Sequence, residues 1–133
     1  MAFTYYTDNA LLNEMFGGVA FTPPATLYIG LSTSTPTASG TGATEPSGNA
    51  YARVAVVNNA TNFPNAANGT KTNGTTITFP QATGSWGTVT YFVIYDAASA
   101  GNLIGFGALN NSQTVSNGDT LSFATSAMTL TLN

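Results

Sequence analysis

The stretch GTVTYFVIYD, residues 87–96, decides the fold class because it is the most hydrophobic segment of the chain. Its run of aromatic and β-branched residues from Tyr91 to Tyr95 is typical of a strand that is buried on both faces. The linker AASAGN follows directly and ends the apolar run. The stretch therefore predicts a central strand of a β-sheet.

Other segments with strand-like patterns lie on both sides of this stretch. They are predicted at residues 26–33, 50–58, 75–80, 103–109, 119–124 and 128–133. Clusters of Gly, Asn, Pro and Ser separate them, including the tight-turn signals Asn68-Gly69 and Asn73-Gly74. This arrangement predicts an all-β fold, an antiparallel β-sandwich of the jelly-roll type.

A short helix is predicted before the strands, in TDNALLNEMFGG at residues 7–18. One apolar stripe along this helix is formed by Leu11, Leu12, Met15 and Phe16. A helix of about two turns is not stable alone. We therefore expect the stripe to dock, either on the sheet of the same chain or on a neighbouring subunit.

The chain of 133 residues is most simply one domain. Residues 1–24 form the predicted N-terminal helical arm, and residues 25–133 form the β core. Two long loops are expected within the core, at residues 34–49 and 58–74. Both are rich in residues that favour turns and lack a hydrophobic period.

Charged residues make up 5% of the chain, where about 25% is typical. The polarity comes instead from 23 Thr, 14 Asn and 14 Gly, while 8 Phe and 6 Tyr supply material for a core. Two cationic side chains are too few for a surface that binds nucleic acid.

No apolar run is long enough to cross a membrane, and the N-terminus does not resemble a signal peptide.

The sequence contains no His and no Cys, which excludes Ser-His and Cys-His nucleophiles, disulfides and the common zinc sites. A two-carboxylate glycan hydrolase needs only a pair of acids. The five acids are Asp8, Glu14, Glu45, Asp96 and Asp119. Two of them fall on the helix, and both Asp96 and Asp119 fall in turns, where Asp caps its own backbone. We predict no catalytic residue, no cofactor and no metal site.

Trp86 is the single tryptophan, in GSWGTV at the start of the central strand. It could stack on a sugar, but packing in the core or in an interface is favoured for a large aromatic residue. Four Asn-X-Ser/Thr sequons also occur, at Asn59, Asn68, Asn73 and Asn110. With Thr this abundant, we interpret them as chance occurrences and not as glycosylation sites.

Arg53 is one of two cations, the other being Lys71, which falls in a turn-rich loop and is expected to be solvated. Because no catalytic partner is available, we predict that Arg53 pins the fold or a subunit contact. Its planar guanidinium suits bidentate pairing. Glu45 is the leading partner, followed by Asp96 or a carboxylate of a neighbouring subunit, and Tyr51 is expected to pack beside Arg53.

Four blocks of the sequence resemble, in order and spacing, a family of small virion proteins of tailed bacteriophages. They are PPATLYIGLSTSTPT (23–37), EPSGNAYARVAV (45–56), ITFPQATGSWGTVTYFVIYDAASAGNLIGFGAL (77–109) and GDTLSFATSAMTLTL (118–132). The family is often described as tail fibre proteins, and similar small β proteins serve as capsid decoration proteins. It often has Gly-Gly after the Asp-Ala-Ala-Ser turn, where this chain has Ala100-Gly101.

The resemblance implies a structural protein of a bacteriophage virion that is made in the cytoplasm of the bacterial host. We expect a capsid decoration (cement) protein on the outer surface, a dimer or trimer that binds the major capsid protein or other virion proteins. The scarcity of cations fits the outer surface, since an inner lining would face DNA. The alternative is a tail fibre or receptor-binding tip or adaptor that contacts host glycan.

Overall fold

The apolar stretch 87–96 forms β6 (Gly87–Tyr95), the middle strand of a five-stranded antiparallel sheet in a computed structural model that describes residues 1–132. Val89, Phe92, Val93 and Ile94 are all buried along it. Successive residues of a strand point to opposite faces of the sheet, so burial of adjacent residues means that both faces are covered here. This agrees with the pattern of the sequence.

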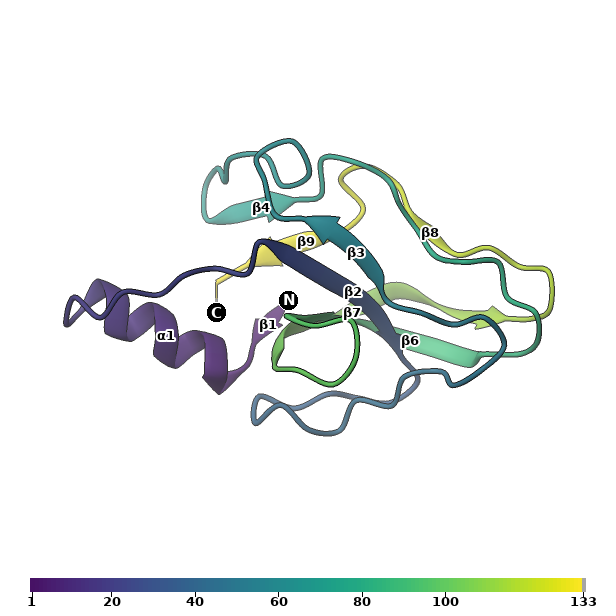
Figure 1. Ribbon diagram of the computed structural model, residues 1–133. Helices are drawn as coiled ribbons and strands as arrows, with labels where there is room; N and C mark the ends of the chain where they lie inside the picture. The colour runs from purple at the N-terminus through teal and green to yellow at the C-terminus, as the bar shows by residue number, and fades with distance from the viewer. Residues whose placement is uncertain (133) are drawn as a thin grey trace.

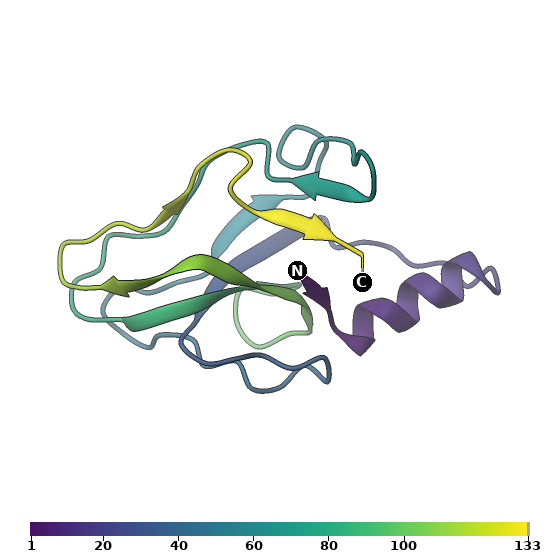
Figure 2. The same cartoon turned by 180° about the vertical axis from the view of Figure 1, so that it is seen from behind.

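The helix and strands follow one another along the chain as shown in Figures 1 and 2. They are β1 (Ala2–Phe3), α1 (Tyr5–Met15), β2 (Thr26–Ser32), β3 (Val54–Val57), β4 (Thr70–Thr72), β5 (Ile77–Thr78), β6 (Gly87–Tyr95), β7 (Leu103–Val115), β8 (Ser122–Phe123) and β9 (Thr129–Thr131). The large sheet has the order β1-β7-β6-β2-β3, and two small sheets pair β4 with β9 and β5 with β8. The predicted antiparallel all-β fold class with a short N-terminal helix is confirmed.

The core lies between the large sheet and the small two-stranded sheets. Phe123 of β8 packs edge-on against Phe92 of β6, with ring centroids 6.1 Å apart, and also against Phe79 after β5, at 6.2 Å. Ile29 and Leu31 of β2 are completely buried in the same cluster. Long-range aromatic packing therefore holds the small sheets on the large one, because ladders of two or three residue pairs are too short to stand alone.

Several predicted bounds need correction. The predicted loop 58–74 contains β4, which pairs with the C-terminal strand β9. The predicted strand 50–58 begins only at Val54, because Asn49 and Ala50 adopt left-handed backbone conformations with φ of 52° and 66°. β7 runs to Val115, beyond its predicted end at 109, through a polar segment without strand-like alternation. Asn133, the last residue of the predicted strand 128–133, lies outside the described residues.

β7 changes register abruptly against β6. Val89 pairs with Gln113, but Tyr91 pairs with Ala108, so Thr90 alone faces the whole segment 109–112. This segment is a large β-bulge, with ladder pairs on both sides of it and a second, smaller register shift between Ile94 and Tyr95. Such bulges bend a strand and redirect its side chains.

The N-terminal arm joins the body at its base. The amide of Thr4 donates to the carbonyl oxygen of Ile104 at 3.0 Å, and the hydroxyl of Thr7 donates to the same oxygen at 2.8 Å. Beyond this anchor the helix extends away from the sheet (Figures 1 and 2). Thr7 is its one buried residue within the described chain, so threonine hydroxyls, and not the predicted apolar stripe, attach the helix to its own sheet.

The buried Asn73 fastens the C-terminal segment to the loop before β5. Its side-chain amide donates to the carbonyl oxygens of Thr75 and Ala124, both at 2.9 Å, and its side-chain oxygen accepts from the amide of Met128 at 2.9 Å. Asn73 is 0% exposed, so this sequon is not available for glycosylation in the folded chain.

Asn73→Ala should lower the free energy of unfolding by about 1–3 kcal/mol, because it leaves buried backbone groups without partners. Urea denaturation measures the change. Asn65→Ala, an exposed asparagine of the loop before β4, is the matched control and should change the stability by less than about 0.5 kcal/mol. Equal values for the two variants would contradict the role given to Asn73.

Candidate functional site

Arg53 lies against Glu45 in a buried ion pair. Its Nε donates to Oε1 of Glu45 at 3.0 Å, and its Nη2 donates to Oε2 at 2.7 Å. The side chains are 7% and 20% exposed, respectively. The two parallel hydrogen bonds form the bidentate geometry that favours arginine over lysine. The structure thus brings together the pair that the sequence singled out.

The same arginine also binds the turn between β6 and β7. Its Nη1 donates to the carbonyl oxygens of Ala97 at 2.7 Å and Ala100 at 2.8 Å, and its guanidinium carbon lies 3.6 Å from the centre of the Tyr95 ring. Stacking of a guanidinium on an aromatic face adds a cation–π attraction. Arg53 lies directly before β3 and therefore connects three segments: the loop 34–49, the start of β3 and the turn 96–102.

Asp96, the second candidate partner, does not pair with Arg53. Its carboxylate accepts from the backbone amide of Asn102 at 2.7 Å and from the side-chain amide of the same residue at 2.8 Å. It closes the turn at which Ala100 adopts a left-handed conformation with φ of 53°. Ala100 occupies the position where the resembled family often has glycine, and its carbonyl oxygen is one of the two that receive Arg53.

Tyr51 links the ion pair to the sheet. Its hydroxyl donates to Oε1 of Glu45 at 2.7 Å and accepts from the backbone amide of Leu31 in β2 at 2.9 Å. We name the set Arg53, Glu45, Tyr51 and Tyr95 the clasp. The hydroxyl of Tyr51 thus joins the clasp to the backbone of β2, the strand beside β6.

Gly30 is the member of this site that the sequence prediction missed. A Cβ atom at Gly30 would lie 2.6 Å from Oε1 of Glu45 and 2.8 Å from the hydroxyl of Tyr51, which is closer than real Cβ contacts allow. The absent side chain provides the space in which the carboxylate and the phenol meet. The sequence does contain a signal for this contact, namely a glycine inside the strand-like segment TLYIGLST. A glycine within a strand often marks a site where another group closely approaches the backbone.

Burial sets the electrostatics of the clasp. Loss of water around the phenol raises the pKa of Tyr51 far above its ordinary value, and the hydrogen bond and charge of Glu45 raise it further. For Arg53, burial alone would lower the pKa, but the hydrogen bonds and charge of Glu45 outweigh it and raise the pKa. At neutral pH the phenol is thus protonated and the arginine charged, so the clasp is a fixed structural device.

Trp86 is 4% exposed, which removes it as a surface platform for sugar stacking. Its indole N–H donates to the carbonyl oxygen of Asn49 at 2.9 Å, and its ring meets that of Tyr51 edge-on at 5.2 Å. It packs in the core directly under the clasp, which is the packing role that the sequence favoured.

The carboxylates do not form an acid pair. Asp8 and Glu14 lie on α1, Glu45 is engaged by Arg53, and Asp119 accepts from the amide of Ser116 at 2.8 Å. Within residues 1–132, no three His, Cys, Asp or Glu side chains are grouped so that they could hold a metal ion. No helix in that part of the chain is long and apolar enough to span a membrane.

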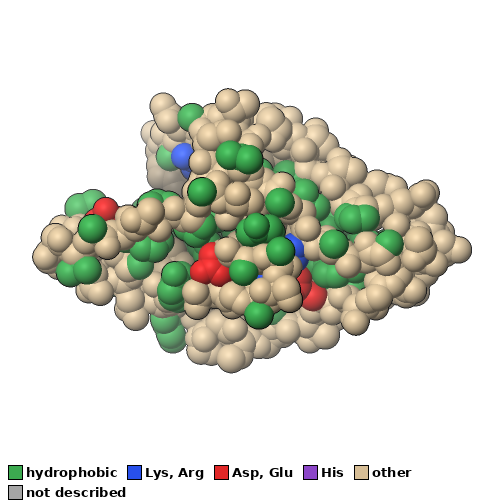
Figure 3. Space-filling model, viewed as in Figure 1, with side chains coloured by type: hydrophobic (Ala, Val, Ile, Leu, Met, Phe, Trp, Pro, Cys, Tyr) green, Lys and Arg blue, Asp and Glu red, His purple; other side chains and the backbone are tan. Residues whose placement is uncertain are grey.

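The apolar stripe of α1 faces outward. Leu12, Met15 and Phe16 are 56%, 74% and 78% exposed, and Val19 beyond the helix is 59% exposed. Leu11 is partly buried, in a shallow apolar depression that these side chains share with Leu132. Figure 3 shows hydrophobic side chains on the surface of the projecting arm. The apolar stripe therefore does not dock on the chain's own sheet.

These features define a small, charge-poor β protein with an internal clasp and an exposed apolar arm. Residues 2–131 match the family Gp80, described as podophage GP4 fiber I protein gp80. The match covers nearly the whole chain, so the protein belongs to this family of phage fibre proteins. No curated protein matches the chain.

Membership of this family favours the second of the two virion roles that the sequence suggested, capsid decoration protein and tail fibre protein. It is a fibre family, and it gives no support to the role of capsid decoration protein. The fibre role, which the sequence suggested as the alternative, is the one favoured.

Arg53→Met should lower the free energy of unfolding by about 3 kcal/mol, because Glu45 is left buried without its counter-charge. Urea denaturation measures the change. Lys71→Met, which removes the other cation, should cost less than about 0.5 kcal/mol. The double variant Arg53→Met, Glu45→Gln should lose less stability than the sum of the single variants. An effect of Arg53→Met no larger than that of Lys71→Met would refute the stabilising role of the clasp.

Stability should fall as the pH rises above 10, the ordinary pKa of tyrosine. Because the pKa of Tyr51 is raised in the folded state, its stabilising contribution is complete below that pH and is lost progressively above it, where the unfolded chain releases the proton and the folded chain keeps it. Urea denaturation from about pH 8 to about pH 11 measures the slope. Tyr51→Phe should show a shallower alkaline loss than the natural chain, and equal slopes would contradict the assignment.

Proposed function

We propose that the protein is a non-enzymatic structural subunit of a fibre on the tail of a bacteriophage virion. The observation that carries this proposal is the match of residues 2–131 to a phage fibre family. Residues 1–133 contain no long repetitive pattern of the shaft type, so the part that we propose for them is that of a tip or adaptor module. The clasp and the aromatic core supply rigidity, which suits a module that transmits load and performs no chemistry.

We further propose that the arm is the assembly contact and that its partner is a second copy of the chain. A helix of 11 residues that is anchored at its base gains little from its own sheet, so its large exposed apolar side chains need another surface. The formal net charge of −3 gives weak repulsion between copies. A dimer or trimer joined through the arms would bury Leu12, Met15 and Phe16 together.

The location of the protein tests the fibre role. Immunogold labelling of intact virions with an antibody against this chain should place gold at the tail. Mass spectrometry of separated tails and heads should recover the protein with the tails. Label spread over the whole capsid shell, with the protein recovered from heads, would overturn the fibre proposal in favour of the decoration role.

The double variant Met15→Ser, Phe16→Ser should convert the natural oligomer to a monomer, because it removes apolar area that association would bury. Sedimentation velocity measures the mass, and thermal unfolding checks that the fold is kept, as expected for side chains 74% and 78% exposed. Val57→Ser, on the edge strand β3 and 57% exposed, is the control and should remain oligomeric. A natural chain that is monomeric, or a double variant of unchanged mass, would contradict the arm contact.

A further inference from the structure

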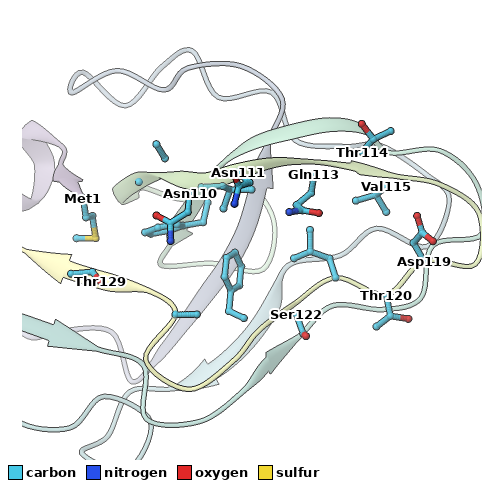
Figure 4. Close-up of a pocket in the computed structure, with 17 residues that line it drawn as sticks. Met1, Asn110, Asn111, Gln113, Thr114, Val115, Asp119, Thr120, Ser122 and Thr129 are labelled. Atoms are coloured by element: carbon cyan, nitrogen blue, oxygen red, sulfur yellow. The ribbon is translucent and has the colours of Figure 1, made fainter.

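A groove runs between the outer edge of β7 and the C-terminal segment around β8 (Figure 4). Its volume is about 730 Å³, within the range of pockets that hold small organic ligands. It exists because β1 covers β7 only at Gly105 and Phe106. Within the described chain, no strand pairs with the remainder of that edge.

The β-bulge of β7 directs amide side chains into this groove. Asn110 and Asn111 come from the bulge itself and Gln113 from the first pair after it, and Figure 4 shows all three beside the open space. All three are exposed, and their amide groups have no hydrogen-bond partner among residues 1–132.

Several side-chain amides elsewhere in the chain are used differently. Those of Asn49, Asn58 and Asn62 donate to backbone carbonyl oxygens at 2.8–3.0 Å, and those of Asn73 and Asn102 are bonded as described above. These amides stabilise the chain itself. The amides beside the groove, in contrast, are free to bind something else.

Aromatic and aliphatic side chains form the apolar part of the groove. Phe92 is buried at its base, and the half-buried Phe123 packs against it edge-on. Leu109 and Leu121, both partly buried, complete the apolar surface. An apolar ring edge beside free amides forms an amphipathic surface, with hydrogen-bonding groups along one side.

The charge of the groove limits what it can bind. Asp119 is the one Asp, Glu, Lys or Arg side chain among its described lining residues, and it is already engaged by the amide of Ser116. No Lys or Arg side chain is among the described residues that line the groove, so the amino terminus of Met1 is the one cationic group that they offer to a carboxylate or phosphate group. A single carboxylate also cannot supply the acid pair needed for glycoside hydrolysis.

We propose that this groove binds a neutral carbohydrate. Amides donate and accept hydrogen bonds at once, as the hydroxyl groups of a sugar require, and aromatic side chains pack on the apolar C–H faces of sugar rings. Addition of a peptide strand is disfavoured, because the bulge breaks the regular edge of β7. The proposal deepens the fibre role proposed above and relies on it for a biological setting, namely contact with glycan on the bacterial surface.

The isolated protein can be tested with methyl glycosides of neutral hexoses, a 6-deoxyhexose and N-acetylhexosamines by saturation-transfer-difference NMR. Sialic acid and glucose 6-phosphate serve as anionic probes. We expect at least one neutral glycoside to bind at millimolar concentration and the anionic probes to give no signal. Absence of binding by every neutral probe, or equal binding of the anionic ones, would overturn the proposal.

Asn111→Ala and Gln113→Ala should each weaken that binding by about tenfold, because each removes hydrogen bonds to the sugar. Asn65→Ala, an exposed amide outside the groove, is the matched control and should bind like the natural chain. Unchanged affinity in both groove variants would overturn the assignment. Self-association that these variants abolish, without a sugar signal in the natural chain, would assign the groove to a second copy and also overturn it.

The sugar experiment uses isolated protein, whereas the fibre role is tested by the position of the protein on virions. Failure of one is therefore distinguishable from failure of the other. Binding of a neutral sugar by a chain found on the capsid shell would support the groove and refute the fibre role. A tail location without sugar binding would support the fibre role and refute the sugar-binding groove.

Discussion

The ion pair between Arg53 and Glu45 is the constraint on which the arrangement of the loops depends. The chain has only five other charged side chains. It places Arg53 and Glu45 where water is largely excluded, so each needs the other as its counter-charge. The remaining donors of the arginine hold the turn after β6, and Tyr51 passes the contact on to the backbone of β2. A loop of 16 residues and a turn distant in sequence are thereby fixed against the strands at the centre of the sheet.

In the rest of the molecule, some side chains hold segments of the chain together and others make no internal contact of this kind. Hydroxyls and amides replace ionic groups as the common polar contacts: threonines anchor the arm, and Asn73 anchors the C-terminal segment. No buried side-chain polar atom of the described residues lacks a partner. Side chains that lack a binding partner therefore lie on the surface. They include the exposed apolar side chains of the arm and the amides beside the groove.

The sequence predicted the parts of this structure that depend on local pattern. The apolar run of β6, the aromatic and branched residues of β2 and the pairing of Arg53 with Glu45 could be predicted from the order of the residues. β4 and the second half of β7, residues 110–115, were missed because partners far away in the chain, not their own composition, make them strands. The outward direction of the helical stripe was not predictable either, since the same pattern fits burial in one chain or between two.

The register jump in β7 has a consequence for how the protein can change over time. β7 pairs with β6 on both sides of residues 109–112, and these residues make no pairs of their own with it. Substitutions, insertions or deletions within that segment therefore leave the register of both flanking halves intact. Changes at the place where the edge of the sheet meets the groove therefore need not disturb the pairs that hold β7 on β6.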